Sequence, residues 1–122
     1  MSWIVRGDDV LAAAEVAVTR RMRAKGLIGR EDFDGAIILR PCRQVHTFGM
    51  RFPIDVVFVD RDWLPIYIEY DVGPNRVLRS RFARSVIEVA AGEAGRLADG
   101  LRIQRVLEDG MSARTAPAPP SR

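Results

Sequence analysis

The chain has 122 residues, 48% of them hydrophobic, which suits one globular domain that buries about two thirds of its unfolded surface. Its formal net charge is +3, with 16 acidic residues interleaved among 19 basic ones, so charge alone leaves the partner open. One cysteine excludes an intrachain disulfide, and with a single histidine it excludes the usual zinc sets. We therefore expect no metal and no cofactor. No leader-like or membrane-length apolar run occurs, which predicts a cytoplasmic protein without a membrane span.

The first third of the chain contains one clear helix signal. Residues 10–18 are apolar and alanine-rich, and their pattern suits either a helix or a strand. Thr19 can cap a short helix over residues 20–25, which Gly26 would end in a left-handed conformation. Residues 36–40 then predict a short strand that Pro41 stops.

The middle of the chain carries the strongest strand signal. Residues 56–59 are four successive apolar β-formers, which predict a strand buried on both faces at the centre of a sheet. Residues 45–48 can form another short strand. Residues 64–70 alternate, with Ile66, Ile68 and Tyr70 on one face, and predict a hairpin partner for residues 56–59. Pro65 suits the start of that strand or a sheet edge.

The last third predicts a loop, a strand and a helix. Residues 71–81 lack periodicity and predict a surface loop, whereas residues 85–89 predict a strand and residues 90–99 a helix. Residues 101–107 could close the sheet. The domain then covers residues 1–110, and residues 111–122 form a disordered tail. The fold class is α+β: a mainly antiparallel curved β-sheet or partly closed barrel with one or two short helices.

Three sequence blocks resemble a known family. The run Met50-Arg51-Phe52-Pro53-Ile54-Asp55-Val56-Val57-Phe58-Val59-Asp60 is distinctive, and residues 23–30 and 86–92 match the other two signatures of the family called domain of unknown function 192. The resemblance runs from about Val10 to about Glu108. It implies a small, single-domain, mostly β fold without an established activity, and it supplies no catalytic residue.

His46 and Asp55 are candidates for acid–base chemistry. An imidazole and a carboxylate brought together can act as a general base pair or bind a metal, provided that the chain bends between them. The alternative, which we favour, is that Asp55 accepts hydrogen bonds from nearby backbone N–H groups and fixes the turn at residues 51–53.

Cys42 is a second candidate for chemistry. A thiol four residues before His46 could meet the imidazole across a bend and act as a nucleophile. No glycine-rich nucleophile elbow and no third orienting residue accompany it. We favour the alternative that Cys42 is a small buried hydrophobe.

The same stretch carries arginines. Arg40, Arg43 and Arg51, together with His46, could form an anion-binding rim over a floor of apolar side chains. The alternative is that the arginine stems only cover the core. The candidate ligand-binding residues are therefore Arg40, Arg43, His46, Arg51 and Asp55.

Two basic clusters could contact nucleic acid, although we favour a solvated surface for both. They are Arg20, Arg21, Arg23, Lys25 and Arg30, and Arg76, Arg79, Arg81 and Arg84.

From these patterns we expect a non-catalytic binding or accessory module with a small-ligand or anion site near residues 40–55. The partner is an unknown small ligand or protein. The first alternative is a hydrolase or transferase that uses His46 or Cys42 with Asp55. Nucleic-acid binding through the arginine clusters is a weaker alternative.

Overall fold

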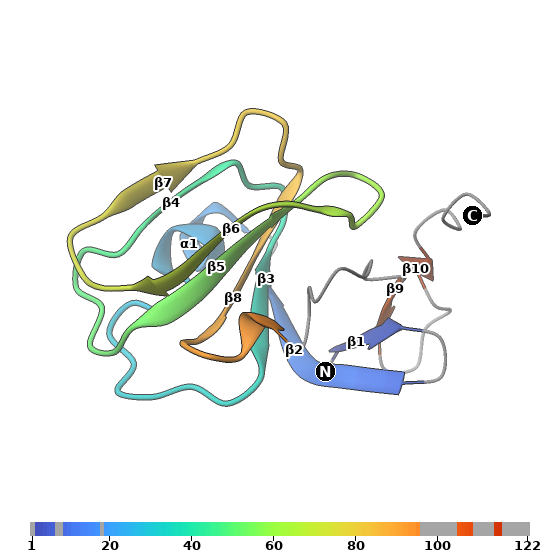
Figure 1. The fold of residues 1–122 in the computed structure, drawn as a ribbon, viewed down its shortest axis with the longest axis horizontal. Helices are drawn as coiled ribbons and strands as arrows, with labels where there is room; N and C mark the ends of the chain where they lie inside the picture. The colour runs from blue at the N-terminus through green and yellow to red at the C-terminus, as the bar shows by residue number, and fades with distance from the viewer. Residues whose placement is uncertain (1, 7–8, 18, 96–104, 109–113, 116–122) are drawn as a thin grey trace.

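The structure is a computed structural model that describes residues 2–6, 9–17, 19–95, 105–108 and 114–115. In these residues the main sheet has eight strands in the order β10-β9-β1-β2-β3-β8-β5-β6, and β4 and β7 form a separate ribbon (Figure 1). The elements are β1 (Ser2–Arg6), β2 (Asp9–Ala17), α1 (Arg20–Lys25), β3 (Ala36–Leu39), β4 (Gln44–His46), β5 (Ile54–Val59), β6 (Pro65–Val72), β7 (Val77–Arg79), β8 (Ser85–Ala90), β9 (Arg105–Glu108) and β10 (Arg114–Thr115).

The main sheet is mixed and open. Its described strands pair antiparallel except for β2 and β3, which are parallel. A parallel pair needs a crossover connection, and α1 with the turn after it supplies this link. The order has two ends, β10 and β6, so the described strands close no barrel. The mainly antiparallel β-rich fold is confirmed, and the described strands form no closed barrel.

The helix α1 forms where its capping residues predict it. Thr19 precedes the helix, and its Oγ1 accepts the backbone N–H of Met22 at 3.1 Å, which satisfies one of the unpaired donors of the first turn. Gly26 ends the helix with a positive φ of 47°. Its ψ of −124° differs from the left-handed helical value that we expected. The backbone N–H of Gly26 still donates to the carbonyl of Met22.

The apolar run at residues 56–59 forms most of β5, and all six residues of this strand are buried. Burial on both faces is confirmed, but the expected central position is wrong. β5 pairs with β8 on one side and with the end strand β6 on the other. The ribbon of β4 and β7 and the turn after α1 contribute Val45, Leu78 and Leu27 to one of its faces. These side chains bury a strand that lies only one position from the sheet end.

Successive residues of the inner strands enter two different cores. One core contains Ile38, Val57 and Ile87, and the other contains Ile37, Val56 and Val86. Neighbouring side chains of a strand point to opposite faces, so each inner strand supplies both cores. This explains why β3, β5 and β8 have nearly continuous apolar sequences.

The hairpin of β5 and β6 is confirmed, but its pairing is interrupted twice. Ile54 pairs with Val72 and Val56 with Glu69, and farther along Phe58 pairs with Tyr67 and Val59 with Pro65. At both places β6 holds one more residue than β5, which is a β-bulge. The predicted alternation therefore fails, because Ile66 and Tyr67 are both exposed, as are Tyr70 and Asp71.

Several expectations change in the last third of the chain. The loop predicted for residues 71–81 contains β7, which pairs with β4. Of the helix predicted for residues 90–99, Ala90 belongs to β8, helical backbone begins at Ala94, and residues 96–99 lie outside the described part. Of the segment 101–107 that was expected to close the sheet, residues 101–104 lie outside the described part, and β9, which begins at Arg105, pairs with β1 and β10. Residues 114–115 of the predicted tail form β10. In the described residues no helix is long and apolar enough to cross a membrane.

Candidate functional site

The five predicted ligand-binding residues lie at different places. Arg40 and Arg43 line two adjoining hollows, and His46 lines a third. Arg51 is exposed and pairs with Glu31 at 3.7 Å. Asp55 is buried inside the sheet. The structure thus brings Arg40 and Arg43 together and leaves the other three apart from them.

The carboxylate of Asp55 is hydrogen-bonded to the backbone of distant segments. Its Oδ1 accepts the backbone N–H of Asp71 at 2.8 Å, and its Oδ2 accepts those of Gly92 at 2.9 Å and Ala94 at 3.0 Å. Asp71 has a positive φ of 52° and lies at a bulge of β6, where the ladder with β5 is irregular. Asp55 therefore accepts backbone N–H groups, as expected, but the donors lie beyond the turn at residues 51–53.

The first hollow, which we call the arginine groove, has a volume of about 310 Å³ and lies where three loops meet. Arg40, Arg61 and Arg84 line it, together with Trp63. The Arg40 guanidinium lies 5.0 Å from the centre of the Trp63 ring, in cation–π geometry. A neighbouring hollow of about 360 Å³ shares Pro41 and Arg84 with the groove and adds Arg43.

Backbone hydrogen bonds hold these loops together. The N–H of Arg84 donates to the carbonyl of Val59 at 2.8 Å, and the N–H of Cys42 donates to the carbonyl of Arg84 at 3.0 Å. Asp60 shapes the loop after β5, because its Oδ1 accepts the backbone N–H groups of Asp62 and Leu64. The arginines of the groove therefore sit on loops that are fixed to the end of β5.

Cys42 lies beside the arginine groove, but its surroundings disfavour the thiolate. Burial raises the pKa of the Cys42 thiol, and the negative charge of Glu88 raises it further. The carbonyl of Gln44 is 3.2 Å from its Sγ. A nucleophilic cysteine needs a lowered pKa, so these surroundings oppose that role.

The third hollow, which we call the Glu88 pocket, has a volume of about 50 Å³. Its side chains come from α1 and the following turn and from β3, β4 and β8. Ile28, Leu39 and Val45 provide apolar walls, and Arg23, Lys25 and His46 provide polar groups. His46 also contacts Phe48, with 5.2 Å between the ring centres.

Glu88 is the most unusual ionisable residue in this pocket. It is 3% exposed, and its Oε1 has no hydrogen-bond partner among the described residues. Burial raises the pKa of Glu88 to about 7, and the backbone N–H of Leu27 opposes the shift only in part. Gly26 lies so close that a Cβ there would be 2.8 Å from Glu88 Oε1.

Sequence reasoning missed Glu88, although one signal was present. The residue interrupts the apolar strand Val86-Ile87-Glu88-Val89, and a lone charge in a strand is usually assigned to a wet face. Both faces of β8 are buried, so no wet face exists for it. A charged residue inside an otherwise continuous apolar strand is therefore a candidate for a buried carboxyl group.

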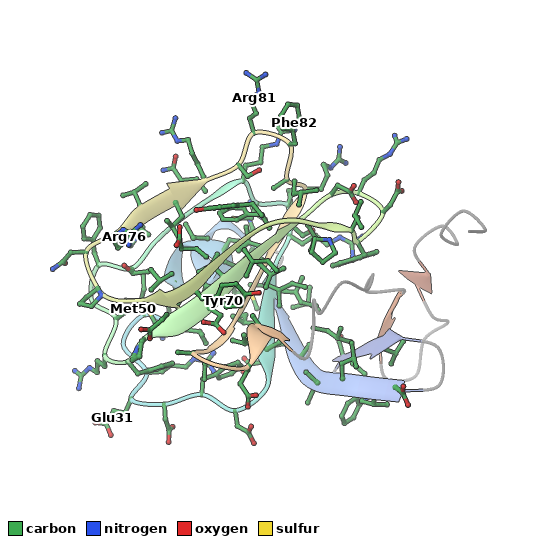
Figure 2. All side chains as sticks on the ribbon, in the orientation of Figure 1. Glu31, Met50, Tyr70, Arg76, Arg81 and Phe82 are labelled. Carbon is green, nitrogen blue, oxygen red and sulfur yellow. The ribbon has the colours of Figure 1, made fainter. Side chains whose placement is uncertain are left out.

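The two basic clusters have separate environments. In the first, Arg23 and Lys25 line the Glu88 pocket, and Arg30 forms a two-hydrogen-bond ion pair with Glu15. In the second, Arg84 lines the arginine groove. Arg81 lies over the exposed ring of Phe82, and both residues project from the loop between β7 and β8 (Figure 2).

The part of the chain that the structure describes contains no group of three or more His, Cys, Asp or Glu side chains that could hold a metal ion.

Comparisons with known proteins give the family and the fold. Residues 3–104 match the family DUF192, described as "Uncharacterized ACR", and the chain belongs to this family. No curated protein matches the chain in sequence.

Two solved structures share the fold. One is a protein of unknown function from Novosphingobium aromaticivorans, with a TM-score of 0.66, 23% identity and coverage of 78% of this chain and 75% of the other. The second, from Sinorhizobium meliloti, is described as a "putative transcription regulator"; its TM-score is 0.65 at 23% identity, with 80% and 82% coverage.

Proposed function

We propose that this chain is a non-catalytic binding module that holds a small anion in the arginine groove. The observation that carries the proposal is the convergence of Arg40, Arg61 and Arg84 on one hollow of about 310 Å³. Guanidinium groups bind phosphate and carboxylate in a two-pronged geometry, and the volume suits a small ligand. Arg43 extends the positive charge into the neighbouring hollow.

The hydrolase or transferase alternative has weaker support. Asp55 already accepts three backbone N–H groups, and burial raises the pKa of Cys42. Neither residue is arranged as an activated base or nucleophile. The ring of Trp63 under Arg40 suits orientation of a ligand rather than proton transfer.

The test is a titration of the protein with phosphate and pyrophosphate, followed by amide and indole chemical shifts. We expect shifts at Cys42, Trp63 and Arg84. The Arg84→Ala variant should bind about tenfold more weakly or worse, because a hydrogen bond to a charged group contributes about 1.5–3 kcal/mol.

Arg51→Ala is the matched control. It also removes one exposed arginine, but Arg51 precedes β5, whereas the groove lies beyond the other end of this strand. We expect its affinity to stay close to that of the unmodified protein. Equal losses in the two variants would mean that general positive charge, and not the arginine groove, attracts the anions.

A further inference from the structure

The Glu88 pocket contains a buried oxygen atom that the fold does not satisfy. Glu88 lines the hollow and is 3% exposed, and its buried Oε1 has no hydrogen-bond partner among the described residues. Leaving a buried polar atom unpaired is costly, and native proteins rarely do so without a reason. Because Gly26 has no side chain, this oxygen can lie close to the backbone of the turn, where a Cβ would be only 2.8 Å from it.

The groups facing Glu88 decide the charge of a ligand that fits. Arg23 and Lys25 come from α1 and His46 from β4. Cys42 does not line the pocket, although the negative charge of Glu88 contributes to the raised pKa of its thiol. Arg23 and Lys25 are two permanently positive side chains beside the one carboxyl group of Glu88. An ammonium group would be repelled by Arg23 and Lys25, whereas an anion is attracted by both.

The size of the pocket limits the ligand further. One water needs roughly 10–15 Å³ on this scale of volume, so about 50 Å³ accommodates about four non-hydrogen atoms. Acetate has this size. The apolar side chains of Ile28, Leu39 and Val45 suit its methyl group or the first carbon of a longer acid.

We propose that the Glu88 pocket is a second binding site, which takes a small monocarboxylate, or the carboxylate end of a larger acid, while Glu88 is protonated. The Glu88 O–H then donates a hydrogen bond to one oxygen of the ligand, and Arg23 and Lys25 balance its negative charge. Binding of the ligand therefore requires that Glu88 carry a proton. This site is separate from the arginine groove and does not depend on it.

Proton coupling gives the proposal a measurable signature. The pKa of Glu88 is about 7, so the protonated form predominates at pH 6 and is the minor form at pH 8. If only that form binds, the dissociation constant rises about tenfold between these pH values. Acetate stays ionised over the whole range, so its own titration does not contribute.

The experiment is a titration of the protein with sodium acetate at pH 6 and pH 8 at constant ionic strength, followed by amide shifts of Gly26, Leu27 and Val45. We expect shifts at these residues and about tenfold weaker binding at the higher pH. Methylammonium chloride, the probe of opposite charge, should leave these amides unchanged. Equal acetate affinity at the two pH values, or binding of methylammonium, would overturn the proposal, as would the absence of any acetate shift.

Three variants identify which residue causes the pH dependence of acetate binding. Glu88→Gln keeps the size and a hydrogen-bond donor but cannot ionise, so it should bind acetate with the same affinity at both pH values. His46→Gln should retain the tenfold ratio, which excludes protonation of the imidazole as its source. Arg84→Ala should bind acetate normally at this pocket even though it weakens the arginine groove. A tenfold ratio that survives Glu88→Gln contradicts the proposal.

Discussion

Asp55 and Glu88 are both buried carboxyl groups, yet their partners differ. Asp55 accepts three backbone N–H groups from segments far away in sequence, whereas Glu88 keeps one oxygen without a partner among the described residues. A carboxylate with several backbone donors is well accommodated as an anion, whereas a desolvated one favours its neutral form. The fold therefore satisfies the carboxylate of Asp55, whereas it leaves one oxygen of Glu88 without a partner among the described residues.

The raised pKa of Glu88 predicts a dependence of stability on pH. In the folded protein this pKa is about 7, against the usual value of 4.5 for a glutamate, so the folded state holds the proton more tightly. Its contribution to stability is complete below pH 4.5 and is lost as the pH rises through 7. Relative to Glu88→Gln, the unmodified protein should lose about 2–3 kcal/mol of unfolding free energy between pH 5 and pH 8.

Urea unfolding of both proteins at the two pH values measures this difference. Other titrating groups are common to the two proteins, so their effects cancel in the comparison. A constant difference in unfolding free energy across the range would mean that the pKa of Glu88 is the same in the folded and unfolded chain.

At the scale of elements, the capping residues and the apolar runs were informative, because they act over a few neighbouring residues. Thr19 and Gly26 delimit α1, and residues 56–59 lie in a fully buried strand. β7 was missed, because only Leu78 of its three residues is buried and one buried side chain does not produce a recognisable alternation of apolar and polar residues. Its formation depends on pairing with β4, which is 31 to 35 positions away, as the pair of His46 with Val77 and that of Gln44 with Arg79 indicate.

The candidate site was also only partly predictable, because it depends on contacts between segments that are distant in sequence. Arg40 and Arg43 are near each other in the chain, and the prediction grouped them with residues of the same stretch. Arg61 and Arg84 reach the arginine groove through loops whose meeting is decided by backbone hydrogen bonds between distant segments. Asp55 pairs across the sheet with Val89, which removes it from the loop surface.

The turn after α1 allows a matched test of the Glu88 pocket. Gly26→Ala and Gly29→Ala each place an alanine at a positive φ, 47° and 84°, and both should be destabilised by about 1–3 kcal/mol of backbone strain. Only at Gly26 would the new Cβ also meet Glu88 Oε1, at 2.8 Å, because nothing lies within 4 Å at Gly29. We expect a lower unfolding free energy for Gly26→Ala than for Gly29→Ala.

Chemical denaturation of the two variants supplies the comparison. Gly26→Ala should in addition abolish the acetate shifts at Leu27, whereas Gly29→Ala should retain them. Acetate binding by a folded Gly26→Ala protein would show that the space beside this glycine is not where the ligand lies.

At the scale of the whole molecule, the sheet separates two cores that share its inner strands. The described part of β1, with β9 and β10, lies toward one end, and the ribbon of β4 and β7 lies toward the other (Figure 1). Ile37 and Ile38 are adjacent in β3 but enter different cores. The two cores should therefore respond separately to small changes in packing.

A pair of substitutions tests this separation. Ile37→Val and Ile38→Val should each lower the unfolding free energy by about 0.5–1.5 kcal/mol, and the double variant should lose the sum to within about 0.5 kcal/mol. Adjacent residues are often coupled, so additivity here would come from their placement on opposite faces of the sheet. A double variant that departs from the sum by more than 1 kcal/mol would show that the cores are coupled through β3.

The two bulges of β6 also affect how the protein meets its neighbours. β6 is the last strand at its end of the described sheet, and such a margin offers its N–H and C=O groups to any extended peptide that approaches. Its extra residues break the even spacing that a foreign strand would have to match. The bulge that Asp55 helps to stabilise thus disfavours edge-to-edge pairing of β6 with a second copy of the chain.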